Sequence, residues 1–171
     1  MNLYLSHSPA IHKGLFSLAL FFMTQMVFSQ SFAYKALLKT LYDADFPVVE
    51  PAEIGDLERF QLLDTREKEE YEVSHIQSAR WVGFDSFSLD RVSDLDKNEP
   101  VLVYCTVGVR SQEIGKKLRE AGFKKVFNLY GGIIHWVNED NPVYRNEHRT
   151  NQVHTFSRTW GIWLQKGEKV Y

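Results

Sequence analysis

Short apolar runs alternate with segments of helical spacing along most of the chain. Short apolar runs predict strands, most clearly where the run is uninterrupted and β-branched, as at Val101–Cys105. These runs are Pro47–Val49, Phe60–Asp64, Ala79–Val82, Val101–Cys105 and Lys125–Leu129. Apolar residues spaced three or four positions apart predict helices or helical turns. These segments are Ser31–Leu41, Pro51–Leu57, Glu67–Tyr71, Ser111–Ala121 and Ile133–Val137, with a loop or short helix at Ser86–Leu95.

Strands separated by helices predict an α/β domain with a central, mostly parallel five-stranded sheet and helices on both faces. Such sheets bind ligands beyond the carboxyl ends of their strands. Two segments follow predicted strand ends, the loop after Cys105 and the segment Asp64–Arg66. The pattern therefore predicts a functional site formed by these two segments.

The amino-terminal residues differ in composition from the rest of the chain. Residues 1–29 contain no Asp, Glu or Arg and a single Lys, Lys13, which precedes the apolar run Leu15–Phe28. A transmembrane helix needs about 20 apolar residues, whereas this shorter run fits the apolar region of a secretory signal. We expect cleavage after Ser29, export to a bacterial periplasm and no stable membrane span afterwards. The alternative is an uncleaved amino-terminal anchor.

The predicted organisation has four parts in chain order. These are a signal peptide at 1–29, a helical segment at 30–46, the α/β domain at 47–142 and a tail at 143–171. In the tail, Trp160, Trp163 and Leu164 have the spacing of one face of a short helix. We expect the tail to pack on the domain, and docking of a partner on this face is the alternative.

The composition limits the chemistry that the chain can carry. With 171 residues, one cysteine and a net charge of −2, it has no internal disulfide and no cysteine-rich zinc site. The near-neutral charge gives no electrostatic footprint for nucleic acid. His135 and His154 lack the spacing of metal ligands, so we predict no metal site. Cys105, the single thiol, is the residue on which the remaining chemistry depends.

Cys105 ends the clearest predicted strand, and the loop after it opens a helix. Successive N–H groups in such a turn form an anion-binding nest, and the helix N-terminus adds partial positive charge. A thiol in this position is favoured as the thiolate, its reactive form. Gly108 permits the positive φ of a tight turn, and the planar fork of Arg110 suits an anionic group. The predicted substrate-binding residues are Thr106, Val107, Gly108, Val109 and Arg110.

An inert strand-end cysteine is the alternative interpretation, and the glycine and arginine that follow Cys105 favour a reactive one. Three motifs lie in order along the predicted domain. They are DTRE at 64–67 followed by Glu70-Tyr71, His75-Ile76 and Ala79; CTVGVRS at 105–111; and LYGGI at 129–133 followed by Trp136. In this order they resemble the signatures of the rhodanese-like family of sulfurtransferases, over about Pro47 to Pro142.

The resemblance implies double displacement at Cys105. The thiolate would take the sulfane sulfur of a small anionic donor such as thiosulfate, and cyanide or a thiol would remove it from the resulting persulfide. The family needs no metal or organic cofactor, because the cysteine carries the transferred group. In the family, loops that prefer thiosulfate often carry more basic charge, and loops that prefer mercaptopyruvate usually have a Gly-Ser-Gly pattern. The loop of this chain has neither feature, and Ser74 stands where a glycine commonly precedes the His-Ile pair. The resemblance therefore leaves the donor open.

A cysteine-dependent phosphatase or reductase and a sulfur-carrier module are the two alternatives to a sulfurtransferase. Four residues separate Cys105 from Arg110, whereas the related dual-specificity phosphatases have five, so a cysteine-dependent phosphatase or reductase is less favoured. A sulfur-carrier or sensing module with little turnover is the second alternative. A pure binding module needs neither the cysteine nor Gly108 and Arg110, and their presence favours catalysis.

Asp64 and Arg66 follow the neighbouring strand, and we predict that they support the site. Asp64 could orient loop amides, and Arg66 could pair with Glu70 or face the pocket. A structural ion pair is the favoured interpretation, although a buried pair there would also shape the site. His75 is interpreted as a core or loop-anchoring histidine.

Overall fold

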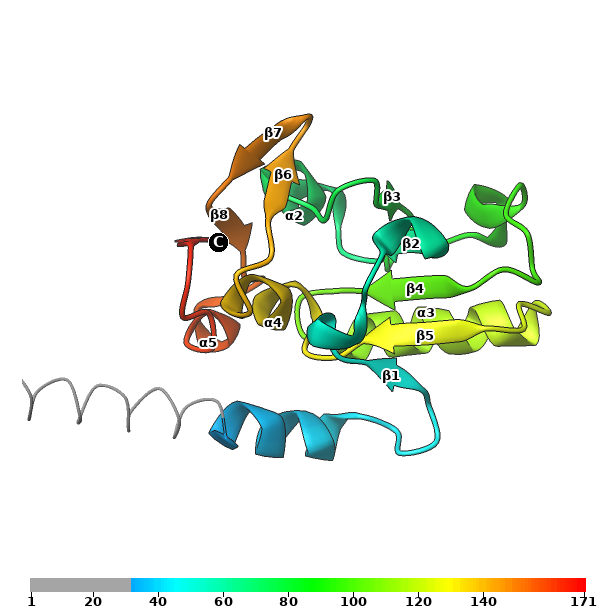
Figure 1. Cartoon of the computed structure of the whole chain (residues 1–171), viewed down its shortest axis with the longest axis horizontal. Coiled ribbons are helices and arrows are strands. Elements are labelled where there is room, and N and C mark those ends of the chain that lie inside the picture. Colours follow the sequence, from blue (N-terminus) through cyan, green and yellow to red (C-terminus); the bar gives the residue numbers. More distant parts are fainter. Residues whose placement is uncertain (1–31) are drawn as a thin grey trace, which may run out of the picture. The chain divides into compact units, whose positions relative to one another are not determined.

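Five short strands form the central sheet in the order β1-β5-β4-β2-β3, and all neighbouring strands are parallel (Figure 1). They are β1 (Val48–Val49), β2 (Gln61–Asp64), β3 (Arg80–Trp81), β4 (Val101–Tyr104) and β5 (Val126–Leu129). The computed structural model describes residues 32–171, so the signal peptide predicted at 1–29 lies outside the described residues. The parallel five-stranded sheet confirms the predicted α/β fold class.

Strand β4 lies in the middle of the sheet. It pairs with β5 on one side and with β2 on the other. All four of its residues are fully buried, and a strand covered on both faces is apolar throughout, which is why its sequence pattern is so clear. This position brings Cys105, the next residue, to the carboxyl edge of the sheet beside the end of β2.

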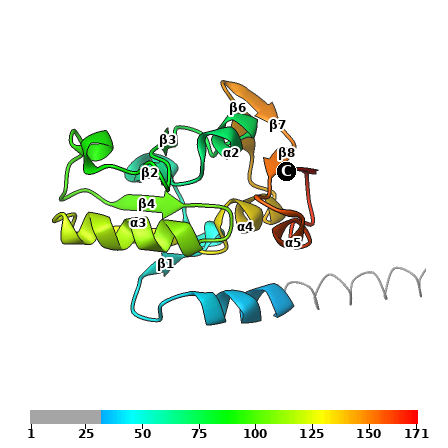
Figure 2. The same cartoon turned by 180° about the vertical axis from the view of Figure 1, so that it is seen from behind.

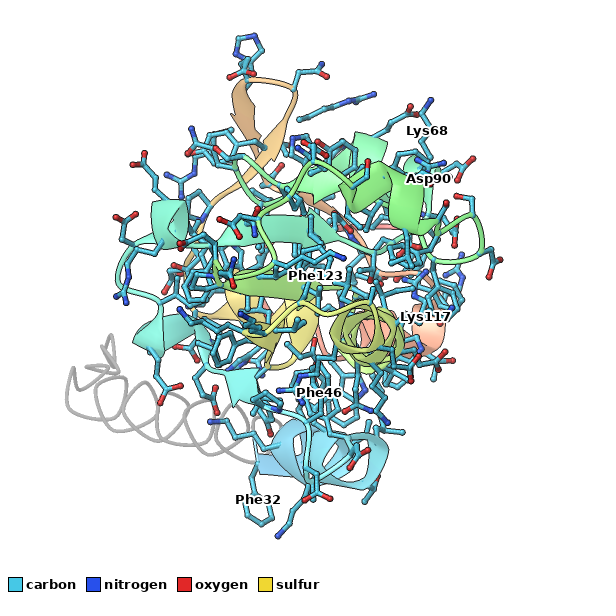
Figure 3. All side chains as sticks on the ribbon, turned by 90° about the vertical axis from the view of Figure 1, so that its right-hand side faces the viewer. Phe32, Phe46, Lys68, Asp90, Lys117 and Phe123 are labelled. Carbon is cyan, nitrogen blue, oxygen red and sulfur yellow. The ribbon has the colours of Figure 1, made fainter. Side chains whose placement is uncertain are left out.

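The helices α2 (Lys68–Val73), α3 (Val109–Glu120) and α4 (Gly132–Asn138) follow β2, β4 and β5 in turn. Helix α3 packs against β4 and β5, along the face of the sheet that Figure 2 turns to the viewer. Ile114 and Leu118 of α3 enter the main core. The other buried members are Phe46, Leu63, Val82, Val92, Val101, Val103, Phe123 and Val126, of which Figure 3 labels Phe46 and Phe123.

Helix α3 begins earlier than its hydrophobic spacing predicts. The expected start was Ser111, but the helix begins at Val109 because Gly108, with a φ of 100°, forms its N-cap. A left-handed residue at this point lets the chain turn from the sheet directly into the helix. In the segment expected as a loop or short helix, Ser86–Leu95, the structure has a 3₁₀ turn, η3 (Leu89–Val92).

The prediction of a single helix at Pro51–Leu57 is wrong. The chain forms two separate 3₁₀ turns here, one within this stretch and a second that begins at its last residue. These are η1 (Pro51–Glu53) and η2 (Leu57–Arg59). The side chain of Asp56 accepts a hydrogen bond from the backbone N–H of Glu58 and so starts the second turn. A short polar side chain that caps the backbone in this way competes with helix continuation.

The tail contains two strand pairs that the hydrophobic pattern did not predict. They are the antiparallel hairpin of β6 (Val143–Arg145) and β7 (His148–Thr150), and the parallel pair of β8 (Gln152–His154) and β9 (Glu168–Val170). In Figure 1 the orange and red tail elements lie beyond the edge of the sheet to which the arrows of β4 and β5 point. The tail therefore stands next to the strand ends where the site was predicted.

The helix expected to present Trp160, Trp163 and Leu164 on one face is shorter than predicted. Helix α5 (Arg158–Gly161) ends before Trp163, and Leu164 is buried beyond it. Its start is fixed by the side chain of Ser157, which accepts a hydrogen bond from Trp160 N–H.

The chain divides into two compact units, Met1–Leu37 and Leu38–Tyr171. In the first, the described residues 32–37 are helical, and in the second the helical residues extend to 41. The second unit contains the whole sheet and the tail. The domain boundaries predicted at residues 46 and 142 stay predictions. Among residues 32–171, no helix combines the length and the apolarity needed to cross a membrane.

Candidate active site

Cys105 is almost completely enclosed at the end of β4. The residue is 1% exposed, and it is the chain's single cysteine. Its Sγ accepts a hydrogen bond from the backbone N–H of Gly108 at 3.1 Å. The loop after the strand therefore turns back over the sulfur, as a cradle for the thiolate requires.

The beginning of this loop is fixed by the start of helix α4. The carbonyl oxygen of Cys105 accepts a hydrogen bond from the N–H of Ile133 at 2.9 Å, and that of Thr106 accepts one from Ile134 at 3.3 Å. Gly132 permits this close approach, because a Cβ there would overlap both carbonyl oxygens. The two carbonyl groups are thereby held towards α4.

The next two carbonyl groups of the loop have side-chain partners. The hydroxyl of Tyr42 donates to the carbonyl oxygen of Val107 at 2.6 Å. The side-chain amide of Asn128, on β5, donates to the carbonyl oxygen of Gly108 at 2.8 Å. Asn128 is itself oriented by the hydroxyl of Ser111, which donates to its Oδ1 at 2.7 Å.

Four consecutive carbonyl groups, from Cys105 to Gly108, thus accept hydrogen bonds from groups outside the loop. The N–H groups of Val109 and Arg110 open helix α3, where no earlier turn of the helix provides them with acceptors. Consecutive N–H groups in such a turn commonly form an anion-binding nest, and the N–H of Gly108 contacts the sulfur directly. This arrangement suits a thiolate or a small anion attached to it.

Arg110 is held in place by Glu70, and its role in binding substrate stays a prediction. Its guanidinium donates to both carboxylate oxygens of Glu70, at 2.7 and 2.8 Å, and to the hydroxyl oxygen of Thr106 at 2.9 Å. Thr106 in turn donates to Glu70 at 2.9 Å. The ring of Phe156, from the tail, lies over the guanidinium with its centroid 4.8 Å from Cζ. These contacts lock the loop to α2.

Both members of this ion pair are held in the charged form. Burial raises the pKa of Glu70, but the hydrogen bonds and charge of Arg110, the charge of Arg66 and the backbone N–H of Glu67 lower it, so the net pKa lies below the ordinary value. Burial lowers the pKa of Arg110, whereas Glu70 and the charge of Cys105 raise it above its ordinary value. A carboxylate and a guanidinium in such a bidentate arrangement form a strong charge-assisted pair.

Asp64 and Arg66 form a fully buried ion pair with each other, and the pairing of Arg66 with Glu70 that we considered does not occur. Arg66 Nη2 lies 2.6 Å from Asp64 Oδ2 and donates to the carbonyl oxygen of Ser74 at 2.6 Å. The guanidinium also lies over the ring of Tyr104, 5.6 Å from its centroid. These hydrogen bonds join the end of β2 to the C-terminus of α2, and the supporting role of the two residues stays a prediction.

Three residues of this arrangement were not recognised as site residues from the sequence. Glu70 belongs to the first of the three motifs, and its role depends on a partner 40 positions away. Asn128 lies inside an apolar strand, where a buried amide is a signal that could have been noticed. Tyr42 lies outside every motif. Within the described part of the chain, no group of three or more His, Cys, Asp or Glu side chains could hold a metal ion.

Comparison with known proteins identifies the family. Residues 51–139 match the family model described as the rhodanese-like domain. The chain therefore belongs to the rhodanese-like family, and the resemblance inferred from its three motifs is confirmed. The match ends before the tail and begins after Tyr42, so both contribute contacts to the loop from outside the matched region.

Individual relatives support the same assignment. The chain is 37% identical over 93 residues to the thiosulfate sulfurtransferase GlpE of Coxiella burnetii, a match that covers 49% of this chain and 85% of the relative. The rhodanese-like domain of the Alr3790 protein from Anabaena sp. is 25% identical, with a TM-score of 0.53 over 73% of this chain and 89% of that one. The polysulfide-sulfur transferase of Wolinella succinogenes is 27% identical, with a TM-score of 0.51 over 67% and 88%.

Proposed function

We propose that the chain is a sulfurtransferase that carries one sulfane sulfur on Cys105. The observation that supports this most directly is the enclosed sulfur, with the Gly108 N–H 3.1 Å from it and the neighbouring carbonyl groups bonded elsewhere. Donors arranged around a sulfur before the reaction stabilise negative charge without further reorganisation. GlpE of Coxiella burnetii, named a thiosulfate sulfurtransferase, supports thiosulfate as the first donor to test.

The proposed reaction has two displacements. The Cys105 thiolate attacks the outer sulfur of thiosulfate, a new S–S bond forms, and the old S–S bond breaks with its electron pair leaving on sulfite. The terminal sulfur of the persulfide retains one negative charge next to the N–H groups of Gly108, Val109 and Arg110. Cyanide or a thiolate then attacks this sulfur, and the electron pair of the persulfide bond returns to Cys105.

The hydrogen bonds between Arg110 and Glu70 favour sulfur transfer over phosphate-ester hydrolysis. A phosphatase of this loop type would use the guanidinium fork to bind the phosphate dianion. Here both arms of the fork are bonded to Glu70, so a dianion would have to compete with a nearly buried carboxylate. A single sulfur atom can be stabilised by the backbone N–H groups alone.

A comparison of wild type with Cys105→Ser tests the proposed function. We expect wild type to transfer sulfur from thiosulfate to cyanide, and we expect the variant to lose this activity because serine cannot hold the persulfide. Equal transfer by the two proteins would exclude Cys105 as the carrier. A persulfide that forms on wild type and is not passed to cyanide or to thiols would instead support a sulfur carrier with little turnover.

We also propose that the protein acts after export. The support is the composition of residues 1–29, with an apolar run that follows a single Lys. Because the chain contains one cysteine, no second thiol within it can resolve the persulfide, and the acceptor is an outside molecule. In a bacterium that expresses the full chain, N-terminal sequencing of periplasmic protein should begin at Gln30. Retention of the full chain in the membrane fraction would support the uncleaved anchor instead.

A further inference from the structure

Tyr42 reaches the cysteine loop from a segment that is anchored on helix α3. The backbone N–H of Asp43 donates to Gln112 Oε1 at 2.9 Å, and the Asp43 carboxylate pairs with Lys116 at 2.8 Å. Phe46, labelled in Figure 3, is part of the main core, and its ring occupies the space next to Gly115. Three contacts with one helix therefore fix the position from which the Tyr42 side chain extends.

The Tyr42 hydroxyl connects the cysteine loop with the residue before helix α4. It donates to the carbonyl oxygen of Val107 at 2.6 Å and accepts from the N–H of Gly131 at 2.8 Å. The loop passes so close to the hydroxyl that a Cβ on Gly108 would overlap it. The ring of Tyr130 packs edge-on against that of Tyr42, with centroids 5.6 Å apart, and limits its movement.

The hydroxyl acts on the sulfur through one peptide group. The carbonyl of Val107 and the N–H of Gly108 belong to the same planar unit and point in opposite directions. Holding the oxygen at Tyr42 therefore directs the N–H towards Cys105 Sγ, which it meets at 3.1 Å. A hydrogen bond accepted by the carbonyl also polarises the amide and strengthens its N–H as a donor.

Tyr42 keeps the proton that this contact requires. Burial raises the pKa of its hydroxyl, and the charge of Cys105 raises it further, although the hydrogen bond from Gly131 lowers it. The net pKa lies well above the ordinary value for tyrosine. The hydroxyl is therefore a donor to Val107 throughout the pH range in which a thiolate reacts.

We propose that Tyr42 is a positioning residue, which aims the Gly108 N–H at the Cys105 sulfur and thereby favours the thiolate and the persulfide. The inference deepens the proposed function, since it rests on Cys105 as the nucleophile. It also extends the site beyond the region matched by the family model, residues 51–139. The effect of Tyr42 passes through the Val107–Gly108 peptide, without direct contact between Tyr42 and the sulfur or a substrate.

The test compares Tyr42→Phe with Tyr130→Phe, which removes a hydroxyl from the neighbouring ring and leaves the contact with Val107 intact. Iodoacetamide alkylation reports on Cys105 alone, because the chain has one cysteine. We expect Tyr42→Phe to lower the alkylation rate at pH 6 by about 3- to 10-fold, the factor for one lost hydrogen bond. Its rate profile should shift to higher pH, and Tyr130→Phe should match wild type. Arg110 and Glu70, the charged pair near the sulfur, are unchanged in both variants.

A second measurement separates positioning from a general loss of structure. In ¹H–¹⁵N spectra the Gly108 amide should move upfield in Tyr42→Phe, with most other amides unchanged. Equal alkylation by Tyr42→Phe and wild type, or equal slowing in both variants, would overturn the proposal. If Tyr42→Phe alone slows alkylation while wild type fails to transfer sulfur, the positioning role stands and the proposed function fails.

Discussion

At the scale of single residues, the arrangement depends on polar groups that have more than one partner. Glu70 accepts from Arg110 and Thr106 and is almost completely buried, so it joins the cysteine loop to α2. Removing one member of a buried pair leaves the other charge uncompensated, which costs more than the pair itself contributes. The loop is therefore sensitive to the charge of this one carboxylate.

The stability of the loop should depend on pH through Glu70. The pKa of this carboxylate is lower in the folded protein than the ordinary value of 4.5. Its contribution is thus fully present above pH 4.5 and is lost as the pH falls through the lower, folded value. Urea unfolding of wild type should show a falling free energy of unfolding over this acid range.

Glu70→Gln tests the assignment of this pH dependence. We expect the variant to lose about 3 kcal/mol at pH 7 and to show a weaker fall in acid. Glu72→Gln, on the same helix, is the control, because Glu72 lies in an exposed pair with Lys68 and its loss should change stability by less than about 1 kcal/mol. An acid fall of the same size in Glu70→Gln and wild type would show that another group is responsible.

At the scale of elements, the site is the junction between β4, the loop after it and the starts of α3 and α4. The sequence allowed β4 and α3 to be predicted, because one is uniformly apolar and the other has regular spacing. The contact between the loop and α4 could not be predicted, since it consists of backbone hydrogen bonds that no side-chain pattern encodes. The one sign of this contact in the sequence is Gly132, where a side chain would overlap the loop.

Gly132→Ala should separate the loop from α4. The added Cβ would overlap the carbonyl oxygens of Cys105 and Thr106, and the φ of 57° is unfavourable for alanine. We expect about 3 kcal/mol lower stability and at least about tenfold less sulfur transfer. Gly55→Ala is the matched control, because its Cβ meets no atom within 4 Å. Wild-type stability and activity in Gly132→Ala would contradict the close approach.

Across the whole molecule, features with a local sequence pattern could be predicted, and features that depend on long-range contacts could not. The sheet and the candidate site residues from Cys105 to Arg110 could be predicted because each segment has a local sequence pattern. Tyr42 and Glu70 were missed as site residues because their partners lie 65 and 40 positions away. The strand pairs of the tail were missed because residues such as His148 and Arg149 are polar and exposed, so pairing leaves no hydrophobic alternation.

The proposed function depends on Cys105 carrying a transferred sulfur atom. Intact-protein mass spectrometry after incubation with thiosulfate tests it most directly. Wild type should gain the mass of one sulfur, about 32 Da, and lose it again when cyanide is added. Cys105→Ser should keep its original mass throughout. An unmodified wild type, or an equal gain of mass in Cys105→Ser, would show that Cys105 does not carry the sulfur.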